Sequence, residues 1–260
     1  RAYYRSRPLI CFCCIIFFYD LYGSHCRFHT LKLSESAADH GYSSPCTLPH
    51  IPFYLKFYTH VARQCASDIT HKMLYRINRD GSIPADNPFV NRPGAVPSIL
   101  SWGHRNPQGL AFQPGTGDLF DLEHGPRGGD EVNLVRKGLN YGWPVISYGM
   151  NYDGTTLTEL TVKEGMEQPL AYWVPSIAPC GANFYAGDLF PKWRDHLFVA
   201  TLAAQELRRL EVSGGKVVAQ EILFKDLGRI RHIVAGPDGA LYALLPERVA
   251  RLAPPSAPGT

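Results

Sequence analysis

Two pairs of polar residues contain arginine, whose side chain can bind anionic groups. Arg105 and Asn106 stand together in the string HRN, and Arg229 and Arg231 stand two residues apart. An arginine guanidinium is planar, so it can pair with a carboxylate through two hydrogen bonds and can stack on a ring. If Arg229 and Arg231 lie on a strand, both side chains point to one face. Arginine is usually exposed, so a solvated strand edge is the competing interpretation of that pair.

A glycine–proline loop followed by two acidic residues is a second candidate site. Gly125–Pro126 leads to Asp130–Glu131 and is directly preceded by His124, while His104 directly precedes Arg105. Glycine allows a close approach of the backbone, and proline fixes the direction of a turn. A histidine beside such a loop invites assignment as a general base. Taken alone, the loop is equally explained as a plain turn followed by a solvated acidic turn.

Short strands joined in hairpins are the elements that must position these residues. From Met73 onward, a strand, a turn rich in Gly, Pro and Asp, and a second strand recur three times. The copies run from GLAF (109–112) to DLF (118–120), from GANFY (181–185) to LFV (197–199), and from IVA (233–235) to LYA (241–243). Repeated antiparallel hairpins build propeller blades, each of which buries a face against its neighbour. The pattern predicts an all-β partial propeller, with a sandwich of hairpins as the alternative.

Composition excludes some classes of partner. The formal net charge is only +3, and the lysines and arginines are scattered, which argues against a nucleic-acid partner. The apolar run Leu9–Tyr19 follows three arginines and imitates an export signal, but it is too short to span a bilayer. Six of the seven cysteines lie in the first quarter of the chain, unlike the even spacing of a disulfide-stapled domain.

The chain divides into three segments by the texture of its sequence. Residues 1–71 show no strand or helix periodicity and are predicted to be an irregular N-terminal segment. A disordered extension and a stretch unrelated to the downstream fold are favoured over a divergent blade. Residues 72–252 are predicted to form the blades, and residues 253–260 a tail.

Five strings in the second segment resemble one enzyme family in order and spacing. They are WGHRNPQGLAF (102–112), EHGPRGGDEVN (123–133), GLNYGWP (138–144), YWVPSIAP (172–179) and RIRHIVAGPDG (229–239). The chain thereby resembles the soluble aldose and glucose dehydrogenases of the glucose/sorbosone dehydrogenase family. The resemblance implies a six-bladed propeller of four-stranded antiparallel blades that holds pyrroloquinoline quinone (PQQ) and Ca²⁺. It also implies oxidation of aldoses at the anomeric carbon to lactones, a soluble electron acceptor, a periplasmic or secreted location and a possible homodimer.

The resemblance also implies roles for individual residues. PQQ bears three carboxylates on a flat quinone, which arginine suits in both respects. The implied cofactor-binding residues are Arg105, Asn106, Gly125, Pro126, Arg229 and Arg231. The implied calcium ligands are the carbonyl oxygens of Gly125 and Pro126, and a second site takes Glu131 and the backbone oxygen of Tyr141. By the same resemblance, His104 and His124 have structural roles. The large apolar rings of Trp143 and Trp173 favour packing between blades, with sugar stacking as the alternative.

Three departures from the family pattern bear on activity. The family's catalytic histidine belongs to a blade upstream of Met73, and no histidine among His40, His50 and His60 has matching surroundings, so the catalytic residue is left unassigned. Ala203 stands where glucose-specific members carry a lysine, and the last blade is shortened around Pro246–Arg248. These departures predict a truncated copy with impaired activity and, as an open half-ring, marginal stability. The alternative function is a non-catalytic propeller that binds carbohydrate or a protein partner.

Overall fold

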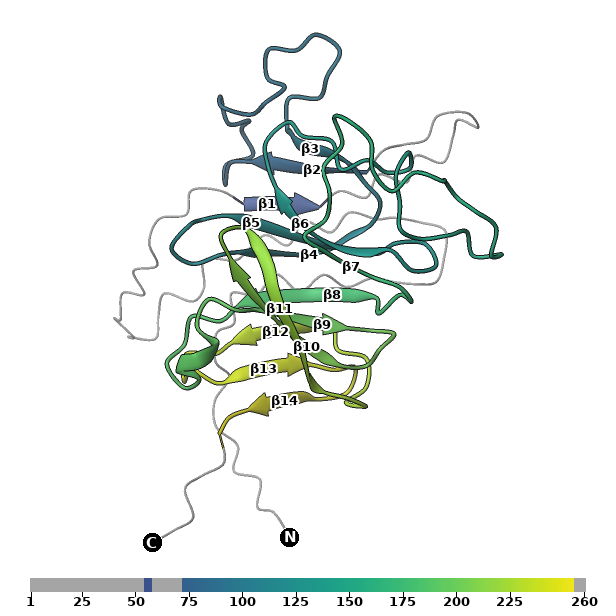
Figure 1. Cartoon of the computed structure of the whole chain (residues 1–260). Helices are drawn as coiled ribbons and strands as arrows, with labels where there is room; N and C mark the ends of the chain where they lie inside the picture. Colours follow the sequence, from purple (N-terminus) through teal and green to yellow (C-terminus); the bar gives the residue numbers. More distant parts are fainter. Residues whose placement is uncertain (1–53, 58–71, 255–260) are drawn as a thin grey trace, which may run out of the picture. The chain divides into compact units, whose positions relative to one another are not determined.

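The computed structural model describes residues 54–57 and 72–254, and the regular secondary structure of this part of the chain is almost entirely β-strand (Figure 1). The strands are β1 (Tyr54–Phe57), β2 (Lys72–Ile77), β3 (Ile99–His104), β4 (Pro107–Phe112), β5 (Leu119–Glu123), β6 (Asp130–Val135), β7 (Ala171–Trp173), β8 (Pro179–Phe184), β9 (Leu197–Thr201), β10 (Leu207–Ser213), β11 (Lys216–Phe224), β12 (His232–Ala235), β13 (Leu241–Leu244) and β14 (Val249–Leu252). A single turn of 3₁₀ helix, η1 (Pro191–Trp193), is the one helical element within these ranges. No helix in the described residues has the length and hydropathy needed to cross a bilayer.

The strands form four antiparallel sheets in which sequence neighbours pair. Their orders are β1-β2-β3, β4-β5-β6-β7, β8-β9-β10-β11 and β12-β13-β14. The three hairpins predicted from the repeated strand–turn–strand pattern are β4–β5, β8–β9 and β12–β13, and all three are present. Turn chemistry closes them; for example, the backbone N–H of Gly239 donates to the Gly236 carbonyl, and Asp238 accepts from the N–H of Ala240.

Strand β9 of the sheet β8–β11 is packed on both faces, whereas the outer strand β11 is largely exposed. In β9, Leu197 and Val199 join an apolar cluster with residues of β5 and β6, whereas Phe198 and Ala200 join a second cluster with residues of β12 and β13. All residues of β9 are buried, so neither face of this strand is exposed to solvent. In a sandwich two sheets share one core, whereas an inner blade of a propeller packs on both sides. The propeller prediction is therefore confirmed, and the sandwich alternative is excluded.

The first strands of successive sheets approach one another closely through glycine. Strand β4 contacts β8, and β8 contacts β12. A Cβ atom on Gly109 of β4 would lie 2.2 Å from the carbonyl oxygen of Cys180, and one on Gly181 of β8 would lie 1.9 Å from Nδ1 of His232. These glycines in the repeated hairpin motif therefore set the spacing between neighbouring blades.

Three details differ from the sequence-based expectation. Arg229 and Arg231 precede β12 rather than lie on a strand, although both are exposed on either side of the buried Ile230, so they still share a face. Two of the four sheets have three strands within the described residues, not four. Strand β1 lies inside the segment predicted to be irregular and pairs with β2; the remainder of residues 1–71, with His40, His50 and His60, lies outside the described residues, as does most of the predicted tail.

Replacing Gly109 by alanine is expected to destabilise the fold by about 1–3 kcal/mol, because the new methyl group would overlap a backbone carbonyl that has little room to move. The free energy of unfolding measured by urea titration checks this. Gly115→Asn is the matched control, since Gly115 has a positive φ that asparagine tolerates and a Cβ atom there would have no neighbour within 4 Å. Equal stability of Gly109→Ala and the unmodified chain would contradict the blade-spacing role.

Candidate functional site

A small, partly open pocket gathers several of the residues singled out from the sequence. It is lined by Gly103, Arg105, Glu123, His124, Gly125, Gly129, Glu131, Tyr141, Trp143, Ile146 and Ser147. Four of the predicted site residues therefore meet here, namely Arg105, Gly125, Glu131 and Tyr141. They come from the segment after β3, the loop after β5, strand β6 and the segment that follows it. The lining combines a guanidinium, two carboxylates and glycine backbone.

Arg105 keeps an unused donor at this pocket. Its Nη1 donates to the His124 carbonyl at 2.9 Å, its Nη2 donates to the Tyr152 hydroxyl at 3.4 Å, and its guanidinium carbon lies 5.2 Å from the centroid of the Trp143 ring. The Nε atom is buried and has no hydrogen-bond partner among the described residues. A buried guanidinium donor without an acceptor favours an anionic ligand at this position.

Glu123 holds the Arg105–Asn106 backbone in place. Its Oε2 accepts the backbone N–H of Arg105 at 2.6 Å and that of Asn106 at 3.1 Å. Its Oε1 accepts from the Asn133 side chain at 2.9 Å, and the same Asn133 amide also donates to Glu131 at 3.1 Å. Glu123 and Glu131 are directly opposite on β5 and β6, where like charges repel. The Asn133 amide thus bridges two carboxylates that would otherwise destabilise the sheet.

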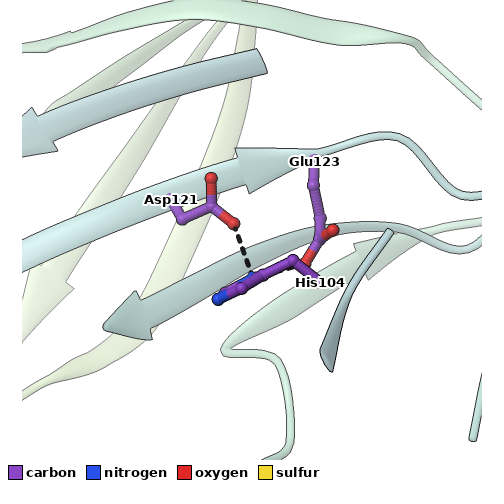
Figure 2. A group of neighbouring side chains, drawn as sticks. All are labelled: His104, Asp121 and Glu123. Carbon is purple, nitrogen blue, oxygen red and sulfur yellow. Dashed lines mark hydrogen bonds and ion pairs between the residues drawn. The ribbon is translucent and has the colours of Figure 1, made fainter. Parts of the chain in front are cut away.

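Figure 2 shows a buried ionic cluster of His104, Asp121 and Glu123, of which Glu123 also lines the pocket. His104 Nδ1 is 3.2 Å from Glu123 Oε1 and 3.4 Å from Asp121 Oδ2, and neither histidine nor aspartate is exposed. Burial alone would lower the pKa of His104, but the interactions with Asp121 and Glu123 outweigh it and raise the pKa to about 9. Burial raises the pKa of Asp121 to about 7, and its oxygens accept no well-aligned hydrogen bond among the described residues.

His104 already has a partner at each of its ring nitrogens within the protein. The ligand atoms of His104, Asp121 and Glu123 lie within 4.8 Å of one another, which is close enough to surround a cation. A histidine binds metal through the lone pair of a neutral imidazole, whereas the neighbouring carboxylates favour the protonated form of His104 and raise its pKa to about 9, and its Nε2 faces Ser101 Oγ at 2.8 Å. The imidazolium is therefore the internal counter-charge of the two carboxylates, and its ring also stacks on Tyr141 at 4.5 Å.

His124 links the pocket to the next blade. Its Nε2 lies 2.7 Å from the Pro179 carbonyl, and its Nδ1 lies 3.4 Å from the Asn106 side-chain amide. Burial lowers its pKa, so the ring is neutral, with the proton on Nε2 and Nδ1 as acceptor. Both ring nitrogens are thereby engaged within the protein, as the predicted structural role requires.

The loop Gly125–Pro126 is tightly built. A Cβ atom on Gly125 would lie 2.0 Å from the Gly128 carbonyl oxygen, so this position admits only glycine. Pro126 is buried and does not line the pocket. Glu131, which does, has a pKa raised to about 8 by burial and by the charge of Glu123. A nearby cation would favour the charged form of this carboxyl group and so offset the effects of burial and of Glu123.

Arg229 and Arg231 lie beside β8 and do not line this pocket. Arg229 Nη1 lies 3.5 Å from the Leu202 carbonyl, next to the exposed Ala203. The Cys180 thiol, whose pKa burial raises, interacts with the side chain of Arg231. Cys180 adjoins Pro179, the acceptor of His124. The second arginine pair is therefore connected to the pocket through one short stretch of β8.

Sequence reasoning missed Asp121, Glu123 and Tyr152. The signal for the first two is the alternation of acidic with apolar residues in LFDLE (119–123), because a period of two places Asp121 and Glu123 on one strand face. The spacing of Asn133 and Glu131 on the paired strand repeats this pattern. Tyr152 is 73% exposed and lies in a segment without strand periodicity, so only the fold brings it to Arg105. Trp173 is packed in the core as predicted.

Removing the positive charge from the buried cluster should be far more costly than removing a negative one. His104→Ala is expected to cost about 3–5 kcal/mol, because two buried carboxylates lose their counter-charge. Asp121→Asn should cost less than His104→Ala, because His104 keeps Glu123 as a partner at 3.2 Å and burial already disfavours the charged form of Asp121. Denaturant titration of both variants checks this, and similar costs would contradict the assignment of His104 as the counter-charge.

Comparison with known proteins assigns this chain to a family. The model of the family described as "Glucose / Sorbosone dehydrogenase" matches residues 59–253. The aldose sugar dehydrogenase YliI of Escherichia coli (strain K12) is 45% identical over 177 residues, covering 67% of this chain and 48% of that protein.

Solved structures agree with this match. A crystal structure of a glucose dehydrogenase is 46% identical with a TM-score of 0.67, covering 70% of this chain and 54% of that one. A PQQ-bound aldose sugar dehydrogenase from Streptomyces coelicolor is 29% identical with a TM-score of 0.51, covering 66% and 45%. The chain spans about half the length of these relatives. By the extent of the family match, the chain belongs to the glucose/sorbosone dehydrogenase family.

Proposed function

We propose that this chain supplies the cofactor-binding blades of a PQQ- and calcium-dependent dehydrogenase that oxidises aldoses at the anomeric carbon to lactones. The observation that carries the proposal is the meeting of Arg105, Gly125, Glu131 and Tyr141 around one pocket, as the family resemblance implied. The PQQ in the Streptomyces structure and the names of the relatives support the same activity.

The residues of the pocket fit both PQQ and Ca²⁺. The buried, unpartnered Nε of Arg105 is a donor that a carboxylate of PQQ would satisfy. The closely packed Gly125 loop brings backbone oxygens near a carboxylate, and oxygen is the ligand type that Ca²⁺ prefers. In this proposal Arg105, Asn106, Arg229 and Arg231 would bind PQQ. The carbonyls of Gly125 and Pro126 would hold one Ca²⁺, and Glu131 with the Tyr141 backbone oxygen would hold another.

The chemistry then divides between cofactor and protein. Bound PQQ, polarised by Ca²⁺, would supply the two-electron oxidising capacity. The protein binds and orients: the Arg105 guanidinium is fixed by the His124 carbonyl and the Trp143 ring, and its backbone is fixed by Glu123. The ring nitrogens of His104 and His124 are engaged in the protein, so neither is assigned as the proton acceptor.

Activity of the chain by itself is proposed to be impaired. The family's catalytic histidine is expected upstream of Met73, where most residues lie outside the described part. A periplasmic or secreted location and a soluble electron acceptor belong to the same proposal. The competing function, a non-catalytic propeller that binds carbohydrate or a protein, would be favoured by a folded chain that does not bind PQQ.

Equilibrium binding of PQQ to the purified chain, in calcium and in chelator, tests the proposal. We expect saturable binding that requires calcium. Arg105→Ala and Arg231→Ala should each weaken it by about 10- to 100-fold, the loss of one charged hydrogen bond of about 1.5–3 kcal/mol. Arg136→Ala is the control, because Arg136 pairs with Asp118 at the surface. Absence of binding by the unmodified, folded chain at all calcium concentrations would reject the dehydrogenase proposal.

A second prediction separates the side chain of Tyr141 from its backbone. Glu131→Gln should lower the calcium affinity at least tenfold, because a ligand charge is lost. Tyr141→Phe should leave calcium affinity unchanged but lower stability by about 1–2 kcal/mol, since the hydroxyl donates to the Leu134 carbonyl and accepts from the Arg136 N–H. Calorimetric titration with CaCl₂ checks both. A calcium defect in Tyr141→Phe would show that the hydroxyl, not the backbone oxygen, is the ligand.

A further inference from the structure

Asp130 is a buried carboxylate with four hydrogen-bond donors from two separate segments. It is wholly buried at the start of β6. Its Oδ1 accepts the backbone N–H of Gly125 at 2.9 Å. Its Oδ2 accepts Ser176 Oγ at 2.7 Å and the backbone N–H groups of Ile177 at 2.7 Å and Ala178 at 2.8 Å. One side chain thus joins the loop after β5 to the turn that leads into β8.

The contact with Gly125 fixes the direction of one peptide group. The N–H of Gly125 and the C=O of His124 belong to the same planar peptide bond, so they point in opposite directions. With the N–H held by Asp130, the His124 carbonyl faces the other way, where it accepts Nη1 of Arg105. The carboxylate is therefore connected to the guanidinium at the pocket through a single rigid peptide unit.

The other oxygen of Asp130 holds the turn at 176–178 against this loop. Ala178 has a φ of +51°, in the left-handed region that costs energy for residues other than glycine. The Asp130 carboxylate holds the turn in this shape, because it accepts hydrogen bonds from two backbone N–H groups and from the Ser176 hydroxyl. The following residue, Pro179, accepts the hydrogen bond from His124. The loop after β5 and the turn before β8 are thus joined twice, once through Asp130 and once through the hydrogen bond between His124 and Pro179.

We propose that Asp130 is a positioning residue for the calcium and PQQ site, acting through the Gly125 peptide. It does not line the pocket and touches no ligand itself. It sets the orientation of the Gly125 loop and, through the His124 carbonyl, that of Arg105. The inference rests on the proposed function and adds to it the residue that holds the ligand-binding loop in its working geometry.

Asp130→Asn separates the contact of this side chain with Gly125 from its contacts with residues 176–178. Its single amide oxygen would serve the three donors of 176–178, which leaves the amide NH₂ facing the N–H of Gly125, a contact between two donors. Asp130→Asn should thus release Gly125 while it retains the turn. Ser176→Ala is the matched control, because it removes one donor on the other oxygen and leaves the Gly125 contact intact.

The experiment measures PQQ binding to the full chain across a calcium titration, with thermal melts to show that each variant is folded. We expect Asp130→Asn to weaken calcium-dependent binding at least tenfold and Ser176→Ala to stay within about threefold of the unmodified chain. If Asp130→Asn does not fold, Asp130→Glu replaces it, since its extra methylene displaces the carboxylate from Gly125 and the same loss is expected.

The outcomes are distinguishable. Normal binding by a folded Asp130 variant would overturn the positioning role and leave the proposed function intact. Equal losses in the Asp130 variant and Ser176→Ala would also overturn it, in favour of general packing. Absence of PQQ binding by the folded, unmodified chain would reject the proposed function and this inference together.

Discussion

A carboxylate removed from water must find donors or a counter-charge inside the protein, and the pocket is built around that requirement. Glu123 meets it with backbone N–H groups of Arg105 and Asn106 and with the Asn133 amide. Asp130 meets it with four donors of its own, and Asp121 relies on the charge of His104. The acids thereby determine the path of the loops, because each loop must present its N–H groups where a carboxylate already lies.

The blades supply the rigid frame for these loops. Residues of β9 alternate between two apolar clusters, so the inner blade is fixed on both sides. The glycines of β4 and β8 then allow the first strands to approach closely. Because these strands begin next to the pocket, the spacing of the blades also sets the separation between Arg105 after β3 and Arg231 before β12.

Much of the fold and part of the site could be predicted from the sequence. The hairpins were predictable because each combines a two-residue alternation with a Gly, Pro or Asp turn, and both signals are local. The residues proposed to bind PQQ and Ca²⁺ were identified only through the resemblance. Two arginines spaced two residues apart give the same sequence pattern on a solvated strand edge as in a binding site. The strand expected at Arg229 and Arg231 was wrong, because alternation of exposed and buried residues also occurs in an extended segment without ladder pairing. The buried role of Asp130 was not predictable, and a solvated acidic turn explained the sequence equally well, because the four donors of Asp130 lie up to 48 residues away.

The ties between the loop after β5 and the turn before β8 have a consequence for how this family diverges. Asp130 joins Gly125 to residues 176–178, and His124 joins Pro179, so neither segment can change its length or path alone. Substitutions in one segment are tolerated only with compensating substitutions in the other. Among relatives, these two stretches, about 50 residues apart in sequence, should therefore evolve as one covarying unit, while the exposed turns between strands drift independently.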